Sequence, residues 1–245
     1  GSIVTYTNMT LQQIRDQVRN VVDIDSSDIS DQTLDIMIGQ GFDTIVYSEK
    51  RWPFFETSTT FSTVGGQSDY SLSTIGTSIT QGMREIFALR TDSDVCEYVG
   101  RDLGDFANPL DGLGSGSPTH WSYWGDSVRF YPTPDAVETI YVRGVRNPTA
   151  FPSTLDGNGN NIAPDLPSPF HPLLAIYAAS RAYLQQEDPT MAAQYDRQFQ
   201  IELDNLARRY ADTPAPQPMM LNSRARNRVD LRYPKRYQNT GGLIF

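Results

Sequence analysis

One apolar stripe near the C-terminal end of the chain constrains the fold more than any other feature. Six large side chains recur there at intervals of three or four residues: Met191, Tyr195, Phe199, Leu203, Leu206 and Tyr210. This spacing places them on one face of an α-helix. Asp188 and Pro189 supply an N-cap and a first-turn proline, so the helix is predicted to begin there and to end near Ala211. A face this apolar predicts packing in a core or an interface.

Three further helices are predicted from the same period. The first covers residues 11–22 and begins with Thr10 and Gln13, a capping-box pair. The second begins near Ser30 and ends before Pro53, and the third covers residues 172–187. Their apolar positions are Leu11, Ile14, Val18 and Val21 in the first helix, Leu34, Ile38, Phe42, Ile45 and Val46 in the second, and Leu173, Tyr177 and Leu184 in the third.

Between Phe54 and Val145 the pattern becomes that of a β-sheet. Short segments rich in Thr, Phe, Tyr and Val alternate with turns, and the predicted strands are residues 57–63, 69–72, 84–90, 121–124, 127–131 and 138–143. Gly65-Gly66 and Gly125-Asp126 are predicted hairpin turns. Residues 102–119 and 147–168 are predicted polar loops.

The expected fold class is therefore α+β. It combines a mainly helical bundle, made of two N-terminal and two C-terminal helices, with a central β-rich insertion and an extended C-terminal arm. The expected segments are residues 1–53 and 169–212 for the bundle, 54–168 for the insertion and 213–245 for the arm.

The arm differs from the rest of the chain in charge. Residues 213–245 contain six basic side chains and one acid, a net charge of +5, whereas the whole chain has a formal net charge of -9, so the remainder carries -14. Pro214, Pro216 and Pro218 favour an extended backbone. The candidate binding residues are the cations, two interleaved tyrosines and three terminal apolar residues: Arg224, Arg226, Arg228, Arg232, Tyr233, Lys235, Arg236, Tyr237, Leu243, Ile244 and Phe245.

Three interpretations of the arm are open. Spaced charges followed by apolar anchors suit docking along an acidic protein surface. Cations interleaved with tyrosines also suit RNA or single-stranded DNA, although a body at -14 opposes a polyanion. A solvated tail without a partner is the third.

The sequence offers no pattern typical of an enzyme, and no cofactor or metal is expected. His120 and His171 are far apart, and neither has a cysteine nearby that would complete a zinc site. His171 is better interpreted as a helix-start residue. The segments 112–116 and 156–160 resemble a phosphate loop and a calcium loop only in part. Asp135 and Glu138 form a carboxylate pair only by proximity in the sequence.

Two further observations concern the compartment. Cys96 is the single cysteine and cannot form an intramolecular disulfide. The apolar runs are shorter than the ~20 residues of a membrane span, and no secretory signal is visible. A cytosolic folding environment is expected.

Several short motifs, taken in order, resemble those of the head-to-tail adaptor (connector) proteins of tailed bacteriophages. The resemblance covers about residues 8–211. It is carried by the order of elements and by Arg51-Trp52-Pro53-Phe54-Phe55, Gln67-Ser68-Asp69-Tyr70-Ser71-Leu72, Phe130-Tyr131-Pro132-Thr133-Pro134, Leu166-Pro167 and Phe170-His171-Pro172-Leu173-Leu174.

The resemblance implies a structural role in the neck of a virion. Members of that family form a ring, usually of twelve copies, beneath the portal protein, and an extended C-terminal segment binds the portal. For this chain it implies a ring between the portal and a downstream tail or terminator protein, assembled in the host cytoplasm, through which DNA passes without specific binding. A nucleic-acid-binding protein and another phage tail ring, such as a terminator or baseplate component, are the alternatives.

Overall fold

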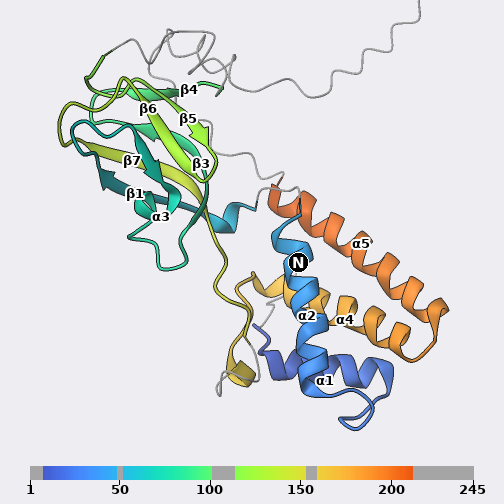
Figure 1. The fold of residues 1–245 in the computed structure, drawn as a ribbon. Coiled ribbons are helices and arrows are strands. Elements are labelled where there is room, and N and C mark those ends of the chain that lie inside the picture. Colours follow the sequence, from blue (N-terminus) through green and yellow to red (C-terminus); the bar gives the residue numbers. More distant parts are fainter. Residues whose placement is uncertain (1–7, 49–51, 101–113, 153–158, 212–245) are drawn as a thin grey trace, which may run out of the picture. The chain divides into compact units, whose positions relative to one another are not determined.

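The computed structural model describes residues 8–48, 52–100, 114–152 and 159–211 (Figure 1). Helices occupy both ends of this part of the chain and a curled sheet occupies its middle, so the expected α+β class is confirmed. The predicted arm, residues 213–245, lies outside the described residues.

The two N-terminal helices begin at the predicted caps. Helix α1 (Leu11–Val22) starts after Thr10, whose hydroxyl accepts a hydrogen bond from the backbone N–H of Gln13, while the Gln13 side chain accepts one from the Thr10 N–H. This reciprocal pair satisfies two N–H groups that a helix start leaves unpaired. Helix α2 (Asp31–Val46) starts after Ser30, whose hydroxyl accepts from the N–H of Thr33.

Helix α2 ends before Pro53, as predicted, and its last helical residue is Val46. The carbonyl of Ile45 accepts hydrogen bonds from the Ser48 hydroxyl at 2.8 Å and from the Trp52 indole N–H at 2.7 Å. Side chains therefore satisfy a carbonyl at the end of the helix, where no further helical N–H is available.

The C-terminal helices are α4 (His171–Gln185) and α5 (Pro189–Ala211). Pro172 lies in the first turn of α4, and the Asp188 carboxylate accepts from the N–H of Met191 at 3.0 Å, so both predicted starts are confirmed. The expected core position of Leu184 is wrong, because its side chain is 48 % exposed near the end of α4.

Helix α4 is the centre of the bundle, because it packs against α1, α2 and α5. The Tyr177 ring of α4 contacts Phe199 of α5 at 5.0 Å between ring centroids. On α2, the absence of a side chain at Gly41 leaves room for the same Tyr177 ring. The α5 stripe faces this core, with Phe199 and Leu203 buried and its other members partly buried.

The central region is one seven-stranded sheet. Its strands are β1 (Glu56–Ser62), β2 (Asp69–Ser71), β3 (Met83–Arg90), β4 (Val95–Tyr98), β5 (His120–Trp124), β6 (Ser127–Tyr131) and β7 (Thr139–Arg146), in the order β1-β7-β3-β4-β5-β6-β2. All neighbours are antiparallel except β4 and β5. One face covers a second core made of Tyr70, Ile75, Met83, Ile86, Leu89, Cys96, Trp121, Val128, Phe130, Ile140 and Val142.

Two predicted hairpins have different outcomes. Gly125-Asp126 joins β5 to β6 as expected, with Trp124 paired to Ser127. The prediction of a hairpin at Gly65-Gly66 is wrong, because β1 and β2 occupy opposite ends of the strand order and do not pair. The chain still turns there, and the buried Tyr70 hydroxyl holds that turn by accepting from the N–H of Val64 at 2.8 Å.

Strand β4 and helix α3 were not predicted from the sequence, and strand β7 is longer than predicted. Strand β4 buries only Cys96 among its four residues, so it lacks an alternating signal. Helix α3 (Leu72–Ile75) is a single turn. Strand β7 continues three residues beyond the predicted end at Arg143, since Val145 and Arg146 pair with Glu85 and Met83 of β3.

Gly144 provides a test of the sheet packing. A Cβ at this position would lie 2.1 Å from the Glu85 carbonyl oxygen of β3, which is backbone and cannot rotate away. We expect Gly144→Ala to lower the free energy of unfolding by about 3 kcal/mol, the upper end for overpacking, in urea denaturation.

Gly116→Ala is the matched control, because its added Cβ would meet only the Pro132 side chain, at 3.6 Å. It should change stability by less than about 0.5 kcal/mol. Equal effects of the two substitutions would contradict the described pairing of β3 and β7.

Candidate assembly site at the helix ends and the N-terminal hairpin

The candidate docking residues of the arm, from Arg224 to Phe245, all lie outside the described residues. The structure therefore bears on the place where the arm leaves the bundle. That place is the end of α5, whose last residues are Tyr210 and Ala211.

An aromatic cluster fixes the end of α5. The Tyr210 ring lies 5.3 Å from Phe170 and 5.9 Å from Phe54, and Phe170 lies 5.2 Å from Trp52 in an edge-to-face arrangement. Trp52 and Phe170 are fully buried. Such ring pairs contribute roughly 0.5–1.5 kcal/mol each beyond the area they bury. Two motifs that are distant in the sequence, residues 52–55 and 170–174, therefore meet at the root of the arm.

The same cluster holds the end of α2. The Trp52 indole donates to the carbonyl of Ile45 in the last turn of α2, while its ring packs on Phe170 immediately before α4. The C-terminal ends of α2 and α5 and the beginning of α4 are thus joined by one group of rings. Helix α4 runs alongside α5 in the opposite direction and crosses α2 (Figure 1).

His171 lies beside this cluster as the first residue of α4, as predicted. Its ring is fully buried, with Nδ1 accepting from the N–H of Met9 at 2.9 Å and Nε2 3.2 Å from the Pro164 carbonyl oxygen. These contacts fix a neutral ring with the proton on Nε2. Burial lowers the pKa of His171, although the hydrogen bonds to the backbone oppose this shift. The histidine therefore connects the chain before α1 to the start of α4.

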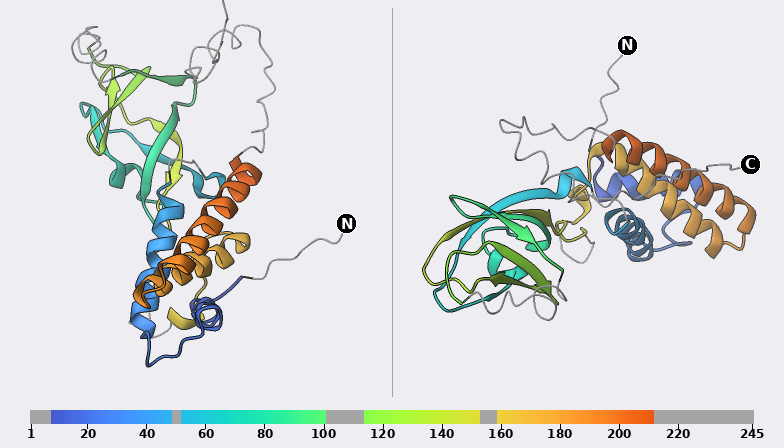
Figure 2. Two further views of the ribbon diagram at one scale, coloured as in Figure 1. Left: turned by 90° about the vertical axis from the view of Figure 1, so that its right-hand side faces the viewer. Right: turned by 90° about the horizontal axis from the view of Figure 1, so that it is seen from above.

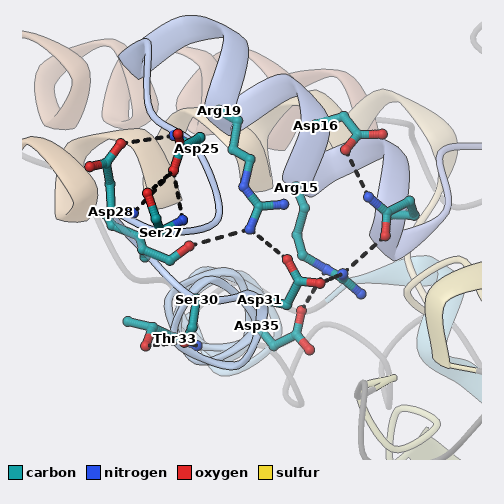
Figure 3. Close-up of polar contacts among 12 residues, drawn as sticks. Arg15, Asp16, Arg19, Asp25, Ser27, Asp28, Ser30, Asp31, Thr33 and Asp35 are labelled. Atoms are coloured by element: carbon teal, nitrogen blue, oxygen red, sulfur yellow. Dashed lines mark hydrogen bonds and ion pairs between the residues drawn. The ribbon is translucent and has the colours of Figure 1, made fainter.

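A buried arginine connects α1 to α2 (Figure 3). The Arg15 side chain is 0 % exposed; its Nη1 lies 3.0 Å from the Asp31 carboxylate and its Nε 2.9 Å from that of Asp35. Its remaining donors bond to the side-chain oxygens of Gln12 and Asn160. A guanidinium removed from water needs this number of acceptors.

Arg19 repeats this arrangement one turn later. Its Nη2 lies 2.5 Å from an Asp31 carboxylate oxygen and 3.3 Å from the Ile29 carbonyl oxygen, and the side chain is 15 % exposed (Figure 3). Asp31 therefore bridges both arginines. Buried or partly buried pairs of this kind are less screened by salt than surface pairs.

Both arginines point into the N-terminal helical hairpin, which consists of α1, α2 and the turn between them (residues 8–48). The surface of this hairpin is acidic as a result. Residues 8–48 contain two arginines and seven aspartates. The exposed aspartates of this segment are Asp16, Asp23, Asp25, Asp28 and Asp43. The net charge of the sequence does not reveal this acidic surface, because it includes Arg15 and Arg19 as if they were exposed cations. The sequence feature that indicates burial of Arg15 is its position on the same face of α1 as Leu11 and Val18.

Several of the residues considered for catalysis or metal binding have structural partners. Asn160, in the short helix η5 (Gly159–Asn161), accepts from Arg15, and Glu138 accepts from the Ser117 hydroxyl at 2.7 Å. His120 bonds to the Thr119 hydroxyl through Nδ1. Asp156 lies outside the described residues. Within residues 8–48, 52–100, 114–152 and 159–211, no group of three or more His, Cys, Asp or Glu side chains converges.

An open cavity of about 700 Å³ lies on β1, β3 and β7. Arg90 and Arg143 line it together with Tyr141, and the Arg90 guanidinium lies 3.9 Å from the centroid of the Tyr141 ring. Ser58, Thr59, Thr60, Ser78, Ala88, Leu89, Val95 and Val142 complete its lining. Hydroxyls and two cations on an open sheet surface suit contact with another protein.

A family model described as SU10 adaptor protein matches residues 9–226. The chain belongs to the SU10 adaptor protein family. A search of curated proteins finds no significant match. None of the described helices is both long and apolar enough to cross a membrane. Membership of this phage adaptor family indicates a structural rather than an enzymatic protein, one that binds other virion proteins.

The extent of the match confirms the resemblance found in the sequence. It includes both pairs of helices, the sheet and the first part of the arm, up to Arg224 and Arg226. The other nine candidate docking residues, from Arg228 onward, lie beyond the matched region. Their roles remain predictions from chemistry alone.

The buried ion pair of this SU10 adaptor family member yields a stability prediction. Arg15→Ala removes the buried guanidinium that lies 2.9 Å from the Asp35 carboxylate, so we expect the free energy of unfolding in urea to fall by about 3–5 kcal/mol. Arg197→Ala, on the exposed face of α5, should change it by less than about 0.5 kcal/mol.

The double variant Arg15→Met/Asp35→Leu separates lost charge pairing from lost packing. It removes both buried charges, and we expect it to recover at least half of the stability lost in Arg15→Ala. A single variant as stable as the wild type would show that the Arg15 network does not hold the helices together.

The buried histidine yields a pH prediction. Because the pKa of His171 is lowered in the folded protein, the unfolded chain binds the proton more tightly. Its contribution to stability is complete above about pH 6.5 and is lost as pH falls below that value. Urea denaturation at pH 7.5 and 5.5 should show this loss in the wild type and a smaller one in His171→Gln.

His120→Gln is the control, since the His120 side chain is 30 % exposed. We expect it to retain the pH dependence of the wild type. If His171→Gln retains that dependence as well, the ring is not held neutral by the fold.

Proposed function

We propose that this SU10 adaptor protein forms a ring between the phage portal and the tail, and that its C-terminal arm docks each copy on the portal. The ring leaves a negatively charged channel for DNA. Family membership supports the adaptor role, and the charge of residues 213–245 supports the mode of docking.

The fixed root of the arm is the observation that carries this proposal. Tyr210, three residues before the first residue of the arm, packs on Phe54 and Phe170. A segment of 33 residues that starts from a fixed point reaches at most about 110 Å when fully extended. Each copy in a ring would therefore present its arm from an equivalent place, as binding to a symmetric partner requires.

The basic and the apolar residues of the arm have different roles in the proposed docking. Six cations orient it on an acidic portal surface, and burial of Leu243, Ile244 and Phe245 in apolar grooves stabilises the contact by roughly 1.5–3 kcal/mol per side chain. Because all arms of one closed ring bind the portal at the same time, a modest affinity of each arm gives a high overall avidity.

The acidic surface of the N-terminal hairpin supports the channel. Since Arg15 and Arg19 point into ion pairs, residues 8–48 expose carboxylates such as Asp16, Asp23 and Asp28 and, within that range, no fully exposed cation. Phosphate contacts with cations are what hold duplex DNA non-specifically. A wall lined by such carboxylates lets DNA slide during ejection. The sheet, with its Arg90 and Arg143 cavity, would then contact a neighbouring copy or the next tail component.

Removal of the arm tests the docking role. We expect a chain lacking residues 213–245 to keep the urea denaturation profile of the intact chain and to bind portal-bearing heads more than about a thousandfold more weakly. Replacement of Leu243, Ile244 and Phe245 by Ser should weaken head binding by about a thousandfold, the lower end of the burial free energy of three side chains, while changing its salt dependence little.

Replacement of the six arm cations by Gln, in contrast, should remove most of the salt dependence of head binding. Normal head binding by the truncated chain would contradict the proposal. Salt-sensitive binding of the intact chain to DNA or RNA, lost with the same six substitutions, would favour the nucleic-acid-binding alternative.

A further inference from the structure

We propose that the open edge of β1, together with the Arg90 and Arg143 cavity beside it, is a docking site for an extended acidic segment of the downstream tail component. The segment adds to the sheet as a further strand. The inference rests on the proposed function and deepens it, because it names the chemistry of the contact on the tail side. The sheet is curled, and β1 is the strand at one of its ends (Figures 1 and 2). An end strand presents backbone N–H and C=O groups to which another chain can bond.

The hydrogen bonds of β1 show which of its backbone groups are open. The N–H of Thr63 donates to the carbonyl of Glu138 at 2.9 Å, and the register of β1 and β7 continues from this pair without a shift. Hydrogen-bonded pairs alternate along an antiparallel ladder, so Thr59 bonds to β7, whereas the backbone groups of Ser58 and Thr60 point away from it. Among the described residues, no backbone group beyond β7 bonds to either residue, and the Thr60 carbonyl accepts a long hydrogen bond of 3.4 Å from the Thr59 hydroxyl. Both residues are exposed.

Strand β1 lacks the features that usually prevent the addition of a strand. Its seven residues pair with β7 without a bulge. Residues 57–61 are Thr, Ser and Phe, with neither a charge nor a proline, and Glu56 carries the only charge of the strand. Natural edge strands are normally protected by charges, prolines or bulges. The edge of β1 is therefore suited to receive another strand.

The cavity lies on the sheet face beside this edge. Arg143 of β7 pairs with Ser58 on one side and with Ala88 of β3 on the other. These small neighbours leave room around the arginine, and the cavity of about 700 Å³ extends to β1 and to Ser78. A strand added beside β1 lies about 4.8 Å from it and about 9.6 Å from β7. A glutamate opposite Ser58 reaches Arg143 over this distance, because both side chains are long and Ser58 is small.

The cavity is basic, although the whole chain has a net charge of -9. None of its lining residues is an acid. Arg90 lies on the Tyr141 ring and donates to the Thr91 carbonyl at 3.2 Å, while the Tyr141 hydroxyl bonds to Asp92. Arg143 is exposed, and the described residues supply no hydrogen bond or ion pair to it. A carboxylate on the incoming strand provides that partner.

The charge of this chain's own terminal segments indicates that the acidic strand comes from another protein. Residues 1–7 contain no charged side chain, and residues 213–245 contain six basic side chains and one acid, a net charge of +5. Neither segment supplies carboxylates, and the proposed function assigns the arm to the portal. The tail-side protein is therefore the occupant to which the proposal commits.

Binding of a synthetic strand to the full-length chain tests the recognition. The probe is a fluorescein-labelled peptide of seven residues in which glutamate alternates with threonine, measured by fluorescence anisotropy. We expect saturable binding that Arg143→Gln weakens roughly two- to fivefold, the effect of one exposed ion pair, and that Arg197→Gln on α5 leaves unchanged. The same peptide with lysine in place of glutamate should bind more weakly by at least this factor. Absence of saturable binding, or equal binding of both peptides, would refute an acidic occupant.

Two proline variants test the addition of a strand. Thr60→Pro removes an N–H that points to the open edge, where proline is tolerated, so we expect wild-type urea denaturation and at least about fivefold weaker peptide binding. Thr59→Pro removes a hydrogen bond to β7 and should lower the denaturation midpoint. With the wild-type chain, methylation of the peptide's glutamate backbone nitrogens, which face Ser58 and Thr60 in this pairing, should weaken binding to the same extent. Equal destabilisation by both prolines, or no effect of the methyl groups, would show that β1 is not the docking edge.

Tail joining identifies the partner and separates this inference from the proposed function. Portal-bearing heads are incubated with the Thr60→Pro/Arg143→Gln chain and then with purified tails. We expect rings on the heads, as with the wild type, and tail joining reduced at least about fivefold. Loss of the rings would assign the edge to a neighbouring copy, and binding of a single-stranded oligonucleotide that Arg143→Gln abolishes would assign the cavity to nucleic acid; either result overturns the inference. Absence of rings with the wild-type chain would contradict the proposed function, whereas the peptide measurements would still decide the docking edge.

Discussion

Trp52 and Phe170 form the contact on which the arrangement of the helices depends. The Trp52 ring meets Phe170 edge-to-face while its N–H satisfies the last turn of α2, and the Tyr210 ring also packs against Phe170. One buried cluster thereby fixes the ends of α2 and α5 and the start of α4. The position from which the arm leaves the bundle follows from it.

The distribution of charge depends on a second group of buried contacts. Arg15 is fully buried between Asp31 and Asp35, and Arg19 shares Asp31. Isolated burial of a guanidinium would be costly, so these carboxylates are needed for folding. The same pairing withdraws the cations from the surface of the hairpin. The ion pairs within the hairpin and the acidic surface that the proposed channel would use therefore arise from the same residues.

The periodic features of the sequence predicted the helices well because they report burial directly. Thr10 with Gln13, and Asp188 with Pro189, marked helix starts that the structure confirms. Features that depend on distant partners were not visible. The end of α2 is set by Trp52, which lies beyond the helix, and β4 exists through pairing with β3 and β5 rather than through its own pattern. The Gly65-Gly66 turn was recognised, but its strands pair elsewhere.

The candidate site was predictable only in part for the same reason. The sequence identified the basic arm and both aromatic motifs, yet it gave no sign that Phe54 and Phe170 meet at Tyr210. It also gave the charge of each segment without the direction of each side chain. Arg15 adds one positive charge to the net charge of the sequence, but its side chain is buried and adds none to the surface.

Cryo-electron microscopy of portal-bearing heads incubated with the full-length chain tests the central claim most directly. The account predicts a closed ring of copies beneath the portal, with extended density leading from the Tyr210 end of each copy onto a portal subunit. Heads without an added ring would contradict it. So would a ring whose arms follow the DNA instead of the portal.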